Sequence, residues 1–193
     1  MNQLLDKYKE YKSIINYRME FSIASNEVVS FRLKQTDFPH LIGLHKLVDI
    51  PVIRQFNNKN NAAVSAKYII SKIKKEEILT EDTIKKSKYF ADIRERFENF
   101  SRDNLLTVSY TDIIVDFNAD LIRSSLKAKY ILFERKNQRY IYLCVAEGAD
   151  GLKYVESFFS NPTDLYIRNQ TMIKIKSIRI YDDKNKLYFE DTI

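Results

Sequence analysis

The sequence is poor in residues that punctuate or cross-link a chain: among 193 residues it has three glycines, three prolines, one cysteine and no tryptophan. A single cysteine, Cys144, has no disulfide partner within the chain, and we expect a small buried side chain in a reducing cytoplasm. No apolar run approaches ~18 residues and the first residues lack the core of a signal peptide, so no membrane partner is expected. Hydrophobic residues nevertheless make up 45% of the chain, enough for a sizeable core.

Signatures of several chemistries are missing as well. There is no Gly-rich phosphate loop and no Gly-x-Ser-x-Gly motif. The two histidines, His40 and His45, would point about 140° apart on one helix. We therefore expect no zinc site between them. Nothing in the sequence indicates another metal or a cofactor, and we expect neither; a metal site built from scattered carboxylates is the alternative that the sequence leaves open. The net charge of +6 favours a polyanionic partner; the alternative is the lysine- and asparagine-rich composition that an AT-rich genome produces.

Helical periodicity marks two parts of the sequence. Residues 4–15 repeat apolar side chains at the spacing of an amphipathic helix. Residues 61–102 contain neither glycine nor proline and predict further helices, one of them capped by Thr80. Because no Gly/Ser-rich linker divides the chain, we predict one domain over residues 1–193, with a helical insertion at about 61–102.

Alternating apolar residues predict strands over 18–24 and 28–34, and again from residue 105 onward. One hairpin is expected to turn at 136–138. In the last long strand the alternation changes phase near Ser177, which predicts a β-bulge. We therefore predict an α+β fold: a twisted, mostly antiparallel sheet with N-terminal helices and the helical insertion packed on one side.

The stretch from Phe38 to Leu47 concentrates the rare residues, since it holds both histidines, one proline and one glycine. Asp37 predicts an N-cap and Pro39 a first helical turn. His40 is then expected in that first turn, where the positive end of the helix dipole keeps the imidazole uncharged and able to accept a proton. Gly43 in the middle of this helix indicates that something approaches the backbone closely.

The sequence Phe-Pro-His-Leu-Ile-Gly-Leu-His-Lys-Leu at 38–47 resembles the His-Leu-x-Gly-Leu signature of a phage and mobile-element family. That family is described as nuclease-like, of the barnase, EndoU, colicin and RelE type, and the chain resembles its fourth subfamily. Weaker similarity lies in 129–134 and 156–166, and the resemblance spans Tyr17 to Ile180. It implies a barnase/EndoU/RelE-like fold and cleavage of RNA.

RNA cleavage without a metal needs a base for the 2′-hydroxyl, an acid for the leaving oxygen and a cation for the phosphate. His40 is the predicted base; the alternative is a histidine that packs in the core or caps its own helix. The other predicted catalytic residues are Lys129 as the phosphate cation, Ser157, and Tyr166 as a proton donor. For each of them a structural role in the sheet is the alternative. The predicted substrate-binding residues are His45, Lys46, Arg168 and Gln170.

Together these features predict a metal-independent endoribonuclease, a toxin or effector of a phage or integrative element, with a cleft between the His40 helix and the sheet. RNA and an antitoxin or immunity protein are the expected partners. The first alternative is a non-catalytic module that binds nucleic acid or protein, with His40 buried in the core. The second is an enzyme that acts on a nucleotide or on another protein.

Overall fold

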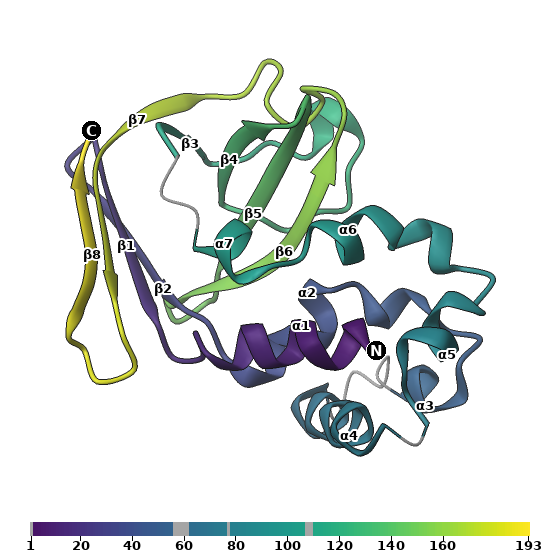
Figure 1. The fold of residues 1–193 in the computed structure, drawn as a ribbon. Helices are drawn as coiled ribbons and strands as arrows, with labels where there is room; N and C mark the ends of the chain where they lie inside the picture. The colour runs from purple at the N-terminus through teal and green to yellow at the C-terminus, as the bar shows by residue number, and fades with distance from the viewer. Residues whose placement is uncertain (1, 56–61, 77, 107–109) are drawn as a thin grey trace. The chain divides into compact units, whose positions relative to one another are not determined.

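The computed structural model describes residues 2–55, 62–76, 78–106 and 110–193, and Figure 1 shows its elements. The chain divides into two compact units. Unit 1 comprises Met1–Ser13 and Lys34–Arg102, and unit 2 comprises Ile14–Leu33 and Asp103–Ile193. Each unit is built from segments that are distant in the sequence, because the chain enters the sheet of unit 2, leaves it and returns.

Unit 2 is an eight-stranded sheet in which every pair is antiparallel. The spatial order is β2-β1-β7-β3-β4-β5-β6, and β8 pairs with β7. The end strands β2 and β6 contact one another, so the sheet is nearly closed. Its strands are β1 (Arg18–Ile23), β2 (Val28–Arg32), β3 (Asp112–Val115), β4 (Tyr130–Lys136), β5 (Arg139–Glu147), β6 (Lys153–Asn161), β7 (Met172–Tyr181) and β8 (Leu187–Thr192).

The sheet confirms the predicted α+β class and its antiparallel pairing; the packing of helices on one side of it stays a prediction. The hairpin of β4 and β5 turns at Asn137 and Gln138, both with positive φ, as a two-residue turn requires. The predicted bulge is also confirmed. Ser22 lies opposite Ser177, but Ile23 lies opposite Ile175, so β7 carries one extra residue there.

Two layers of apolar side chains stabilise this sheet. On one face Phe21 stacks on Phe31 at 6.0 Å and meets the ring of Tyr110 at 6.1 Å. The opposite face of β4 and β5 carries a second buried cluster, which includes Ile131, Tyr142 and the predicted buried Cys144, and the turn η6 (Asp120–Ile122) packs beside it. Both faces of β5 are therefore covered, as its continuous apolar sequence predicts.

Unit 1 consists of short helices around an aromatic core. The ring of Phe38 lies 5.2 Å from Tyr8, 5.5 Å from Tyr11 and 5.5 Å from Phe100. The elements are α1 (Gln3–Lys12), η1 (Gln35–Asp37), α2 (Phe38–Leu41), η2 (Leu44–Lys46), α3 (Pro51–Arg54), α4 (Ala62–Lys75), α5 (Glu81–Lys85), η5 (Phe90–Asp92) and α6 (Arg94–Asn99). Another short helix, α7 (Arg102–Leu105), begins where the chain passes from unit 1 to unit 2.

Helices are present within both segments for which helical periodicity predicts them, residues 4–15 and 61–102. Thr80 caps α5 by accepting the N–H of Thr83 at 3.3 Å, as expected. The first helix ends at Lys12 rather than continuing to residue 15, and Ile14 is buried beyond its end. No helix in the described part of the chain combines the length and apolarity that a membrane crossing requires.

Candidate functional site

The segment that carries both histidines is two short helical turns rather than one helix. The helix α2 ends at Leu41. Beyond it, the backbone N–H of Ile42 donates to the carbonyl oxygen of Phe38, and that of Gly43 donates to the carbonyl oxygen of His40. Gly43 then adopts φ 91°, a left-handed conformation that terminates α-helices. The prediction of a continuous helix through Gly43 is therefore wrong.

A close approach does explain why this position is glycine. A Cβ atom on Gly43 would lie 2.9 Å from Cγ2 of Ile93 and 3.0 Å from Cδ of Arg96. The turn is thus packed directly against residues at the start of α6, and the positive φ and the lack of space both exclude a larger residue. The predicted approach to the backbone is confirmed.

The break at Gly43 brings the two imidazoles together. The rings of His40 and His45 stack with centroids 4.1 Å apart and an angle of 16° between their planes. The expectation that they point about 140° apart assumed one regular helix, and it is wrong because the left-handed residue redirects the chain. Both side chains are half-buried.

Two cationic side chains, Arg96 and Lys46, act electrostatically on His45 of this stacked pair. Burial and the neighbouring His40, Arg96 and Lys46 lower the pKa of His45 to about 3, so its ring is neutral at physiological pH. Burial, together with Arg96, lowers the pKa of Lys46, while Asp92 opposes that shift. The Arg96 guanidinium also donates to the carbonyl oxygen of His40 at 3.4 Å. We call His40, His45, Lys46 and Arg96 the histidine–arginine cluster.

Asp37 is the N-cap residue of α2, as predicted, but its side chain makes no capping hydrogen bond to that helix. Its carboxylate accepts the N–H of Lys34 at 2.8 Å, which caps the preceding turn η1 instead. Burial raises the pKa of Asp37 to about 6, although the bond from Lys34 opposes this. The helix α2 is a single turn of four residues, so His40 lies in its first turn, as predicted, which is also its last. A helix of one turn has only a small dipole, and its effect on the imidazole stays a prediction.

Lys129 immediately precedes β4 in unit 2 and is held by a carboxylate. Its Nζ donates to Glu147 at 2.8 Å, and this bond is the main reason that the Lys129 pKa is raised. Lys153 adds a second cation 3.4 Å from Glu147. Nearby, the hydroxyl of Tyr130 donates to Glu27 at 2.5 Å. We call these five residues the lysine–glutamate network.

Ser157 and Tyr166 belong to the second apolar layer of unit 2. Ser157 is buried on β6, opposite Cys144. The Tyr166 ring lies 4.7 Å from Phe159 and 5.4 Å from Tyr142. This packing places Tyr166 in an aromatic cluster, and its proposed donation of a proton stays a prediction.

The two remaining predicted binding residues make local contacts. Arg168 pairs with Asp164 at 2.7 Å, four residues earlier. The Gln170 side chain accepts the backbone N–H of Asn118 and donates to its carbonyl, at 3.0 and 2.9 Å. These bonds fix the loop that follows β3, and they engage both ends of the Gln170 amide.

The predicted residues thus fall into two groups. His40, His45 and Lys46 lie together in unit 1, whereas Lys129, Ser157, Tyr166, Arg168 and Gln170 belong to unit 2. Sequence reasoning missed Arg96, since the apolar residues around it predict only a helix and give no signal for its contact with Gly43. No group of three or more His, Cys, Asp or Glu side chains suited to a metal ion occurs among the described residues.

The fold and the cluster define an α+β protein with a cationic, histidine-containing site. The chain belongs to the PBECR4 family, described as phage-Barnase-EndoU-ColicinE5/D-RelE like nuclease4, and the match covers residues 3–191. This match confirms the resemblance read from the residues around His40, and the family name indicates a nuclease. No curated protein and no solved structure matches the chain.

Proposed function

We propose that the chain is a metal-independent endoribonuclease of a phage or integrative element, a toxin or effector, whose phosphate-binding site is the histidine–arginine cluster. The observation that carries the proposal is the stack of His40 on His45 beside Arg96 and Lys46. The stack places a proton acceptor, His40, beside two cations, and the chain belongs to a family described as nuclease-like. Antitoxin or immunity partners are part of the same proposal.

Phosphate binding follows from the electrostatics of the cluster. Arginine binds phosphate oxygens in a bidentate way, and lysine adds a point charge. A phosphate bound beside the cations that lower the pKa of His45 would offset the repulsion between those cations. The cluster is thus expected to bind RNA more tightly than it binds an uncharged ligand of the same size.

The proposed reaction is transesterification. His40 takes the proton of a ribose 2′-hydroxyl, and the 2′-oxygen attacks the adjacent phosphorus. The bond from phosphorus to the 5′-oxygen breaks, and Lys46, with its lowered pKa, gives that oxygen a proton. The products are a 2′,3′-cyclic phosphate and a 5′-hydroxyl, while Arg96 stabilises the charge that develops on the phosphate.

The test is cleavage of a mixed RNA pool by purified protein in excess EDTA. We expect cyclic-phosphate ends, no cleavage of an all-2′-deoxy strand, and at least a 100-fold loss of rate in His40→Ala. Circular dichroism and thermal melting check that the variant is folded. Cleavage that requires added Mg²⁺, or that survives His40→Ala unchanged, would overturn the mechanism. RNA binding without cleavage would favour the non-catalytic module.

A further inference from the structure

The helix α4 carries an uninterrupted excess of positive charge. Its fourteen residues, Ala62–Lys75, include four lysines and no acidic residue. Among the described residues, the salt bridges of unit 1 join Lys9 to Asp6 and Lys85 to Glu81, and none involves a lysine of α4. The charge of this helix is thus displayed rather than neutralised by ion pairs in the described part of unit 1.

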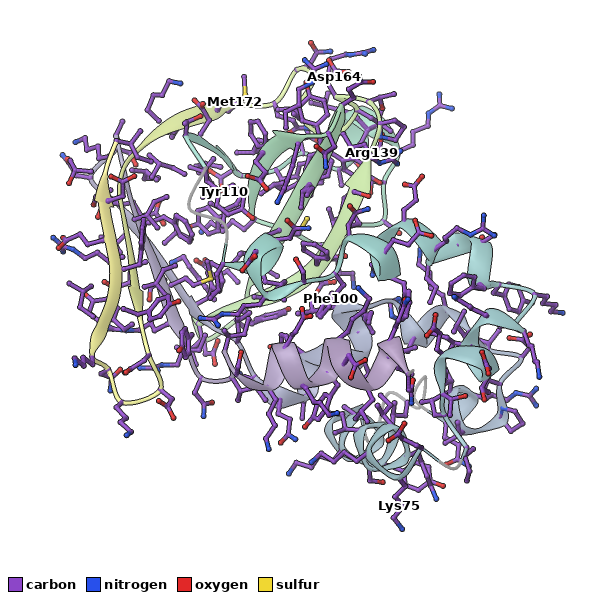
Figure 2. The ribbon with its side chains drawn as sticks, viewed as in Figure 1. Lys75, Phe100, Tyr110, Arg139, Asp164 and Met172 are labelled. Carbon is purple, nitrogen blue, oxygen red and sulfur yellow. The ribbon has the colours of Figure 1, made fainter. Side chains whose placement is uncertain are left out.

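Three of the four lysines, Lys67, Lys72 and Lys75, lie on the outer face of the helix together with an aromatic ring. The Nζ of the fourth, Lys74, lies 5.4 Å from the centre of the buried Tyr8 ring. Lys67, Lys74 and Lys75 are exposed, and Tyr68 is 40% exposed. Lys75 projects from α4 on the side away from α1 (Figure 2). The Nζ of Lys72 lies 5.0 Å from the centre of the Tyr68 ring, so a cation and an exposed ring are adjacent. We call Lys67, Tyr68, Lys72 and Lys75 the α4 patch.

The apolar face of α4 is already occupied. Ala66, Ile69, Ile70 and Ile73 are all buried. A helix that enters a membrane surface needs that face exposed. The outer face offers charge and one ring, which suits a flexible polyanion with accessible bases.

We propose that the α4 patch is a docking surface for single-stranded RNA, outside the catalytic cluster. This inference rests on the proposed ribonuclease function and adds a substrate class to it. The lysines contact successive phosphates, and Tyr68 stacks on an unpaired base, which a duplex does not offer. The patch therefore raises the affinity for single strands while the chemistry occurs at the histidine–arginine cluster.

The experiment measures binding of a fluorescent 16-nucleotide RNA without self-complementarity to His40→Ala protein. Replacing Lys67, Lys72 and Lys75 by Gln is expected to weaken binding about 30- to 100-fold near 0.1 M salt and to reduce the salt slope by about 2. Tyr68→Leu is expected to weaken it about fivefold to tenfold, while Tyr68→Phe keeps the affinity. The matched control replaces Lys176, Lys184 and Lys186 of unit 2, which are also exposed, and should change the affinity less than threefold.

A duplex RNA of the same length separates base stacking from charge, since Tyr68→Leu should leave its binding unchanged. Equal losses in the α4 and control variants, or an equal effect of Tyr68→Leu on both RNAs, would overturn the docking surface. Tighter binding to anionic phospholipid vesicles than to RNA would overturn it as well. Wild-type protein that binds RNA through α4 but never cleaves it would refute the proposed function and leave this inference standing.

Discussion

The two units differ sharply in charge. By sequence, unit 1 has 17 Lys and Arg against 11 Asp and Glu, while unit 2 has 15 of each, which together make the 32 and 26 of the chain. The entire net charge of +6 therefore belongs to unit 1, as do both histidines. The composition of the whole chain does not show this difference between the units. The difference indicates that a polyanion would bind unit 1 rather than unit 2.

The same contrast appears at individual side chains. Around His45 the charged side chains that lower its pKa include the cations Arg96 and Lys46. Around Lys129 the dominant neighbour is the carboxylate of Glu147, and the Lys129 pKa is raised. A cation held by a carboxylate already has its counter-charge, whereas cations that lower one another's pKa gain most from a bound anion.

The largest expected effect tests which cation acts on phosphate. Arg96→Met should lower kcat/KM for RNA cleavage about 100- to 1000-fold, because it removes a charge that stabilises the transition state. Lys129→Met should lower it less than tenfold, since Glu147 already holds that ammonium. Steady-state cleavage rates give both values. Equal losses would break the comparison and support Lys129 as the phosphate cation, as the sequence predicts.

The next effect concerns the two glycines with positive φ. Gly43→Ala should lower the free energy of unfolding by about 2–3 kcal/mol, because the new Cβ meets Ile93 and Arg96 in a strained backbone conformation. Gly151→Ala in unit 2 has a similar φ but nothing within 4 Å, so a loss of about 1 kcal/mol is expected. Urea titrations measure both. Equal losses would show that packing at Gly43 contributes nothing beyond the backbone strain.

The sheet could be predicted closely from the sequence because strand alternation and turn chemistry are local. The bulge near Ser177 and the turn at Asn137 both follow from a few adjacent residues. The structure of the helical unit is harder to predict from the sequence. Gly43 fits a helix interior by its neighbours, and only the packing of Ile93 against it, fifty residues later, shows why it ends the turn.

The candidate site shows the same limit. His40 stands out because the chain has only two histidines, which the sequence shows without any structure. The stack on His45 depends on one left-handed residue, and Arg96 depends on a contact across more than fifty residues. Neither leaves a local pattern, so the sequence correctly singles out the segment but misplaces its geometry.

The last comparison of the two units uses the dependence of stability on pH. The pKa of His45 is about 3 in the folded protein against 6.5 for a free histidine. Its stabilising contribution is therefore complete above pH 6.5 and is lost as the pH falls toward 3, by about 2 kcal/mol at pH 5. His45→Asn should remove this part of the acid sensitivity.

Hydrogen exchange at pH 7.5 and pH 5 locates the effect, because peptides of each unit are observed separately. Asp37, with its pKa raised to about 6, acts in the opposite direction: it favours folding as the pH falls and so partly offsets the loss. Because Asp37 is present in both proteins, the difference in pH response between the wild type and His45→Asn gives the contribution of the histidine alone. Acid-induced opening confined to unit 2, or an unchanged pH response in the variant, would show that the buried neutral imidazole does not control the stability of unit 1.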